Sequence, residues 1–137
     1  MVRIGQRRFT VTAGAFVFDD KNRILLLEHV FRPDSRWGIP GGFLGKGEQP
    51  DVALRRELRE EAALEISDLE FLFARTLPKQ RQVEIYFRCK TASTPKPSSF
   101  EIIKAAWFNV ENLPPELSQD QRKLIQRALG VGEKSGG

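Results

Sequence analysis

The sequence predicts an α/β fold in which a mixed sheet lies between helices. Strand-like segments occur in pairs before and after a central helix, and a second helix follows the last strand. The 137 residues suffice for one domain with a substantial core, and a hydrophobic content of 40% is typical of globular proteins. We expect residues 1–130 to form this single domain and residues 131–137 to be a flexible C-terminal tail.

Charge and cysteine content narrow the classes of function. The net charge of +4 is spread along the chain. This suits an anionic small molecule such as a nucleotide and argues against nucleic acid, because a nucleic-acid site requires a clustered basic patch. Cys89 is the only cysteine, so no intrachain disulfide can form and a reducing compartment is expected. No segment has membrane-spanning length and no apolar signal sequence opens the chain, so we expect a soluble, cytoplasmic protein without membrane contact.

The beginning of the chain predicts a β-hairpin. Residues 8–18 are rich in β-branched and aromatic residues, residues 19–22 form a turn, and residues 23–29 form a second strand. Gly14 inside the first strand indicates a bulge or a close approach of the backbone to a ligand. His29, the only histidine, lies at the end of the second strand and is interpreted as structural.

Residues 37–64 predict a glycine-rich loop that leads into a helix. Pro50 suits the first helical turn, and no glycine or further proline follows before Leu64. Arg32 and Arg36 lie just before the loop. They are candidates for binding phosphate bidentately, although solvation at the surface is the default for such residues.

Three glutamates lie on the apolar side of this helix. At about 100° per residue, with Leu54 at zero, Leu58 falls at about +40°. Glu61 falls at about −20° and Glu57 at about −60°, inside the apolar arc, while Glu60 lies at its edge at about −120°. Buried carboxylates are paired or bind a metal. An oxygen-rich ligand set suits Mg²⁺ or Mn²⁺ rather than zinc.

The alternative is a solvated helix stabilised by salt bridges such as Arg56–Glu60. We prefer the metal site because the acids interrupt the apolar stripe and a glycine-rich loop precedes them. Arg56 lies on the opposite side of the helix and is interpreted as structural, pairing with Glu48 or Glu60 at the loop–helix junction.

The second half of the chain predicts three strands and a helix. The strands are expected at residues 68–77, 81–91 and 102–110, and a mobile polar loop at residues 92–99. Ser118 is expected to cap a helix over residues 119–129, and Gly130 is expected to end it.

The loop and helix carry a motif in which glycine and acidic residues recur at fixed spacing. The motif is Gly, five residues, Glu, seven residues, Arg-Glu, an aliphatic residue, any residue, Glu-Glu, any residue, Gly and an aliphatic residue. The positions that match are Gly42, Glu48, Arg56, Glu57, Leu58, Glu60, Glu61 and Leu64. The chain therefore resembles the Nudix hydrolase family, with Ala63 in place of the glycine that helps to end the helix. The resemblance implies the Nudix α/β/α sandwich.

The resemblance also implies a metal-dependent hydrolase that cleaves the diphosphate linkage of a nucleoside diphosphate derivative by attack of metal-activated water. Glu57 and Glu61 are the expected ligands of Mg²⁺ or Mn²⁺, with Glu60 close to them, and a carbonyl of Gly41 or Gly42 is expected to add another oxygen. The general base is one of these glutamates or an acid near the last strand.

Other residues are assigned from their positions. Glu101 is the best candidate for the acid near the last strand, and its interpretation as a solvent-facing residue at the strand edge is about equally plausible. Glu84 is the second candidate. Glu48 either orients Arg56 or joins the metal shell. Phe43 and Tyr86 are candidates for contacting the base.

Two other functions are kept open: a nucleotide sensor that does not hydrolyse, and a pyrophosphohydrolase acting on RNA 5′ ends. A homodimer is possible by analogy, through the edge of the first strand.

Overall fold

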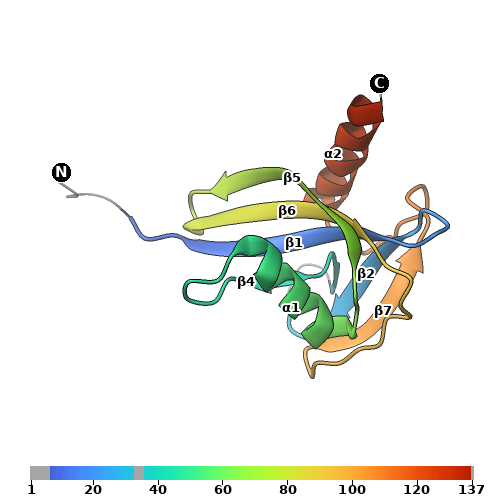
Figure 1. Cartoon of the computed structure of the whole chain (residues 1–137), viewed down its shortest axis with the longest axis horizontal. Helices are drawn as coiled ribbons and strands as arrows, with labels where there is room; N and C mark the ends of the chain where they lie inside the picture. The colour runs from blue at the N-terminus through green and yellow to red at the C-terminus, as the bar shows by residue number, and fades with distance from the viewer. Residues whose placement is uncertain (1–6, 33–35, 137) are drawn as a thin grey trace.

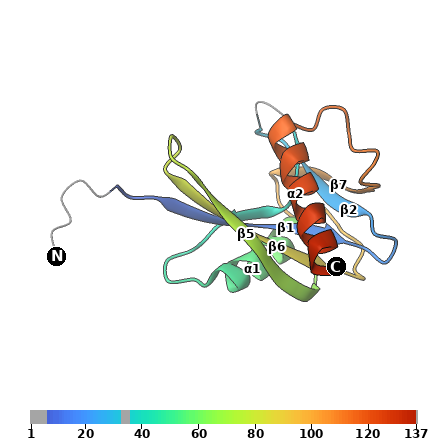
Figure 2. The ribbon, with the colours of Figure 1, turned by 90° about the horizontal axis from the view of Figure 1, so that it is seen from above.

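The computed structural model describes residues 7–32 and 36–136. It contains a mixed sheet with a helix on each face (Figures 1 and 2). The elements are β1 (Thr10–Phe18), β2 (Ile24–His29), β3 (Trp37–Gly38), β4 (Gly41–Phe43), α1 (Pro50–Ala62), β5 (Ser67–Leu77), β6 (Gln82–Lys90), β7 (Ile102–Phe108) and α2 (Gln119–Gly136). The strand order is β3-β2-β1-β6-β5, and β4 pairs with β1 and β7 with β2. The predicted α/β fold with a mixed sheet is confirmed.

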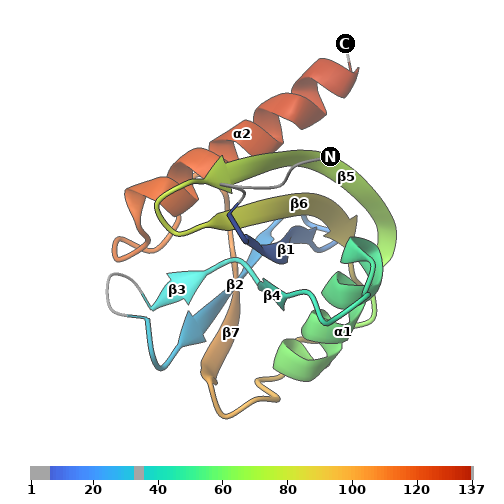
Figure 3. The same cartoon turned by 90° about the vertical axis from the view of Figure 1, so that its left-hand side faces the viewer.

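Alternation along β1 divides the core into two layers. Ala13, Ala15 and Val17 point towards α1, whereas Phe16 and Phe18 point towards α2. Figure 3 shows the two helices on opposite sides of the sheet, with α2 along β5 and β6. Because β1 and β6 are parallel, a long crossover must join them, and this crossover includes α1. The topology thus places the acidic helix beside the centre of the sheet.

Gly14 lies where three strands meet. It pairs with Gly41 of β4 on one side and with Tyr86 of β6 on the other. A Cβ atom at position 14 would lie 3.2 Å from Cε1 of Tyr86. The group that approaches Gly14 in the structure is thus the Tyr86 ring, not the ligand that the sequence suggested.

The end of α1 shows how Ala63 replaces the expected glycine. Ala63 has φ 56° and ψ 37°, in the left-handed region that ends helices. Its N–H donates to the Arg59 carbonyl at 3.0 Å, and the Leu64 N–H donates to the Leu58 carbonyl at 3.2 Å. The helix therefore ends where the motif requires, with an alanine in a conformation that costs an L-residue about 1 kcal/mol.

We expect Ala63→Gly to raise the free energy of unfolding by about 0.5–1 kcal/mol, because glycine adopts this conformation without steric cost. Denaturant unfolding measures the change. The matched control is Ala62→Gly, one residue earlier, where a buried helical alanine is lost and a decrease is expected. A lower stability for Ala63→Gly would contradict the left-handed assignment.

Two predictions about the periphery are wrong. The last helix does not end at Gly130, because the backbone of α2 stays helical to Gly136. An interior glycine costs a helix only about 1 kcal/mol, and no proline follows to stop it. The edge of β1 is not free for a dimer contact, because β6 pairs with one side of β1, and β4 and β2 pair with the other. The predicted cap is present, since Ser118 Oγ accepts from the Gln121 N–H at 3.1 Å.

Candidate active site

A cleft of about 570 Å³ lies between α1, the glycine-rich segment, β6 and the start of α2. This volume is in the range of small-molecule sites. The cleft brings together most of the residues predicted from the sequence: Arg32, Gly41, Gly42, Phe43, Glu57, Glu60, Glu61, Tyr86 and Glu101. Glu48 lines a neighbouring hollow, on the far side of Phe43.

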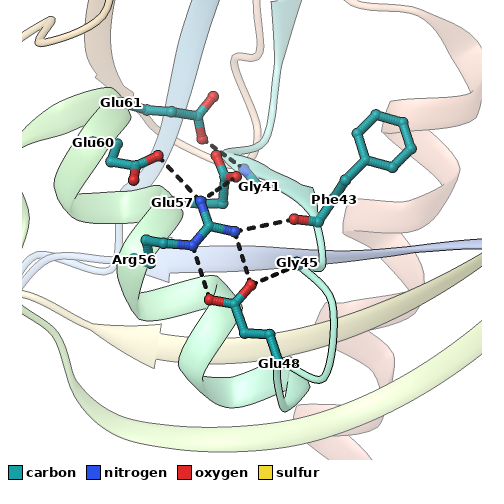
Figure 4. Close-up of polar contacts among 8 residues, drawn as sticks. All are labelled: Gly41, Phe43, Gly45, Glu48, Arg56, Glu57, Glu60 and Glu61. Carbon is teal, nitrogen blue, oxygen red and sulfur yellow. Dashed lines mark hydrogen bonds and ion pairs between the residues drawn. The ribbon is translucent and has the colours of Figure 1, made fainter.

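Glu61 is the buried carboxylate of the cleft. Only 7% of the residue is exposed, and Oε1 accepts a hydrogen bond from the Gly41 N–H at 3.0 Å (Figure 4). Burial and, to a lesser extent, the nearby Glu57 carboxylate raise the pKa of Glu61 to about 8, although the hydrogen bond from the Gly41 N–H opposes the shift. A cation beside Glu61 would remove this penalty.

Glu57 lies against Gly42. A Cβ atom at position 42 would lie 2.5 Å from the Glu57 Cδ atom, so no other residue leaves room for the carboxylate. Burial raises the pKa of Glu57, whereas the hydrogen bond from Arg56 lowers it. The glycine at position 42 of the motif therefore leaves the space that the Glu57 carboxylate occupies.

We expect Gly42→Ala to lower kcat/KM at least about tenfold with little loss of stability, because the added methyl group displaces only the flexible end of Glu57. Steady-state kinetics and thermal unfolding measure the two effects. Gly130→Ala is the control, since a Cβ atom there meets nothing within 4 Å. Unchanged kinetics in Gly42→Ala would show that the position of Glu57 does not matter.

Arg56 joins the loop to the acidic helix (Figure 4). Its guanidinium donates to both carboxylate oxygens of Glu48 at 2.9 Å, to Glu57 Oε1 at 2.9 Å and to Glu60 Oε2 at 3.1 Å. It also donates to the Phe43 carbonyl at 3.1 Å. The hydrogen bonds from Arg56 lower the pKa of Glu48 to about 2. The structure thus contains the expected pairs of Arg56 with both Glu48 and Glu60.

The carboxylate oxygens on α1 are the type of ligand that a hard divalent cation prefers. Glu61 is a buried and Glu57 a half-buried carboxylate of one helix, both with raised pKa values, and Glu60 lies beside them. Among residues 7–32 and 36–136, no three acidic, histidine or cysteine side chains converge closely enough to enclose a metal ion. The contacts explain this, because Arg56 binds Glu57 and Glu60 while the Gly41 N–H binds Glu61. Oxygen ligands of this kind fit Mg²⁺ or Mn²⁺.

The wall across from α1 contains Glu84 together with Gln82 and Gln121, two residues that the sequence analysis did not assign. Glu84 Oε1 accepts from Arg75 Nε at 2.6 Å and from the Tyr86 hydroxyl at 2.8 Å, and Oε2 accepts from Gln82 Nε2 at 3.1 Å. Glu84 is therefore engaged and poorly suited as a general base. The alternation of polar residues along β6 was the sequence signal for this wall. Gln121, on α2, could not be found in this way, because the hydrophobic pattern of a helix identifies only the face that packs against the core.

The two aromatic candidates differ in access. Phe43 is 58% exposed at the mouth of the cleft, so its ring is free to stack on a base. Tyr86 is only 4% exposed, and its ring packs against Phe16 and Phe73 with centroid distances of 5.6 and 5.3 Å. Tyr86 is thus a core residue at the floor of the cleft.

The two arginines predicted to bind phosphate also differ in their position relative to the cleft. Arg32 lines the cleft with its guanidinium against Gly38, and burial lowers its pKa. Arg36 does not line the cleft, and its carbonyl accepts from the His29 N–H at 2.6 Å. His29 does line the cleft, and burial, followed by the charge of Arg32, lowers its pKa to about 4, so the imidazole is neutral at physiological pH.

Glu101 reaches the cleft from the turn before β7. Its N–H donates to Ser99 Oγ at 3.2 Å and its carbonyl accepts from the Val30 N–H at 2.9 Å, so the backbone is held on both sides. Its side chain is exposed and contributes to the raised pKa of Glu61. An acid therefore stands in the cleft apart from the helix carboxylates.

A family model, the NUDIX domain, matches residues 8–128. The chain belongs to the Nudix family. The predicted Nudix α/β/α fold is confirmed. In the described part of the chain, no helix is both long and apolar enough to span a bilayer.

Relatives and solved structures agree with this membership. NAD-capped RNA hydrolase NudC of Vibrio atlanticus is 29% identical over 111 residues, 79% of this chain and 41% of that protein. NAD-capped RNA hydrolase NudC of Pseudomonas aeruginosa is 32% identical over 98 residues, 69% of this chain and 34% of that protein. The chain thus spans less than half the length of these relatives. The crystal structure of MutT NUDIX hydrolase from Burkholderia pseudomallei matches with a TM-score of 0.78 and 23% identity, covering 88% of this chain and 98% of that one. That likeness concerns the fold.

Proposed function

We propose that this Nudix domain hydrolyses the diphosphate linkage of a nucleoside diphosphate derivative and depends on Mg²⁺ or Mn²⁺. The observation that carries the proposal is the burial of Glu61 beside Glu57, on the wall of a cleft of nucleotide size. Buried carboxylates of this kind are stabilised by a cation. The signature glutamates are all present, which favours hydrolysis over a sensor that only binds nucleotide.

Glu57 and Glu61 would hold the cation, with Glu60 and a carbonyl of Gly41 or Gly42 as further donors. The chemistry supplied by such a cation is neutralisation of phosphate charge and activation of water. Arg32, which has no hydrogen-bonded acceptor among the described residues, would bind a phosphate oxygen. Glu101 would accept the proton of the attacking water as the oxygen bonds to phosphorus and the bridging P–O bond breaks.

A turnover panel tests the proposal. The purified chain is incubated with a dinucleotide, a nucleotide sugar and a nucleoside triphosphate, with Mg²⁺ and with EDTA, and the products are separated. We expect release of a nucleoside monophosphate from at least one compound with Mg²⁺ only. Tight binding without turnover of any compound would favour the sensor.

The names of the NudC relatives favour a second candidate substrate, a dinucleotide at the 5′ end of RNA. The same panel, extended by an RNA with this end, separates the candidates. Faster turnover of the RNA than of the free dinucleotide would assign the RNA function, and equal or slower turnover would assign the small molecule.

A further inference from the structure

The cleft has a polar wall that hydrolysis does not use. It is formed by Gln82 and Glu84 of β6 and by Gln121 in the first turn of α2. The carboxylates that would hold the cation come from α1, on the other side of the sheet. This wall, called here the glutamine wall, is therefore suited to a part of the substrate other than the reacting phosphates.

The orientation of both amides is fixed by hydrogen bonds. Gln121 Oε1 accepts from the Ile39 N–H at 3.1 Å, so the two N–H donors of its Nε2 point elsewhere. Gln82 Nε2 donates to Glu84 Oε2 at 3.1 Å, which leaves Gln82 Oε1 as an acceptor. Among the residues that the structure describes, neither Gln121 Nε2 nor Gln82 Oε1 has a further partner.

Glu84 retains one acceptor position. A carboxylate accepts roughly four hydrogen bonds, two at each oxygen. Glu84 Oε1 receives two, from Arg75 and from Tyr86, and Oε2 receives one, from Gln82. The glutamine wall thus offers N–H donors from Gln121 and acceptors from Gln82 and Glu84.

The wall is held rigidly. Arg75, which binds Glu84, also donates to both oxygens of Asp120, at 2.8 and 2.7 Å. Asp120 precedes Gln121, so this pair fixes the start of α2 to β5 and β6. Groups held in place before binding lose little entropy when a ligand arrives.

Resting on the proposed function, we propose that the glutamine wall reads the base of the nucleotide and selects an amide edge, a carbonyl next to N–H donors. The carbonyl would accept from Gln121, and the N–H groups would donate to Gln82 and Glu84. Guanine carries such an edge, with its O6 carbonyl next to N1–H and an amino group. Adenine presents only one ring nitrogen and one amino group there, so it lacks the second donor group and would leave an acceptor of the wall without a partner, at a cost in affinity.

Binding of nucleoside monophosphates tests the proposal without hydrolysis. Calorimetry measures the affinity of the chain for GMP and AMP. We expect GMP to bind at least about tenfold more tightly than AMP. Equal or tighter binding of AMP would overturn the proposal.

Gln121→Glu is the decisive variant. It keeps an oxygen for the Ile39 N–H but replaces the N–H donors by a second acceptor, so the preference over AMP should disappear. Gln119→Glu is the matched control, because it adds the same charge to the same helical turn at an exposed position outside the cleft. If Gln121→Glu does not fold, Gln121→Met removes the donors without a charge and should also abolish the preference.

The same preference in the Gln121 variants as in Gln119→Glu would contradict the assignment. These affinities are independent of turnover. Loss of the predicted preference with hydrolysis intact would refute the glutamine wall alone, and the predicted preference without any hydrolysis would refute the proposed function alone.

Discussion

Glu61→Gln, and likewise Glu57→Gln, is expected to lower kcat/KM at least about 100-fold while the protein remains folded. Each substitution keeps the size of the side chain but removes a charge that would hold the cation, and the activation of water depends on that cation. In Glu61→Gln the new amide oxygen can still accept from the Gly41 N–H, so the loop should stay in place.

Steady-state kinetics on the substrate found in the panel, at saturating Mg²⁺, measures this loss. Glu65→Gln is the control, because Glu65 is exposed just beyond α1 and does not line the cleft. Activity within about a factor of two of the unmodified chain in both Glu57→Gln and Glu61→Gln would refute the role of the helix carboxylates.

The second large effect concerns stability without metal. The folded state raises the pKa of Glu61 to about 8 from an ordinary value of 4.5, so between these values the folded chain binds more protons than the unfolded chain. Stability contributed by the protonated form is therefore present below pH 4.5 and is lost as the pH rises towards 8. Glu61→Gln does not titrate. In EDTA at about pH 8 we expect the variant to exceed the unmodified chain in free energy of unfolding by about 2–4 kcal/mol.

Denaturant unfolding at about pH 5 and about pH 8 measures this difference, which should be much smaller at the lower pH. Comparing the two chains at each pH cancels the titration of all other groups. Added Mg²⁺ should stabilise the unmodified chain more than Glu61→Gln and so reduce the gap. A gap that does not change with pH would mean that Glu61 titrates normally.

The helix and its acids were readable from the sequence because they depend on local rules. Pro50 marks the first turn, and the helical period of about 3.6 residues places Glu57 and Glu61 among leucines. Glycine at position 42 followed from the motif, and the structure adds the reason, which is the space that Glu57 occupies. These features involve residues close in sequence or held in register by one helix.

Contacts between distant segments could not be read in this way. Gln121 reaches Ile39 across 82 positions, and Arg75 reaches Asp120 across 45, so no local pattern predicts either pair. Burial of Tyr86 follows from the sheet order, which places β6 beside β1. The sequence did not predict the continuation of α2 past Gly130, because glycine often follows the end of a helix but can also lie inside one.

The central claim is that the acidic face of α1 holds a divalent cation. Mn²⁺ binding, followed by electron paramagnetic resonance of the free ion, tests it most directly, because the signal of free Mn²⁺ falls as the ion binds. We predict saturable binding to the unmodified chain, at least about tenfold weaker binding to Glu61→Gln, and unchanged binding to Glu65→Gln. Equal binding to all three chains would contradict the claim.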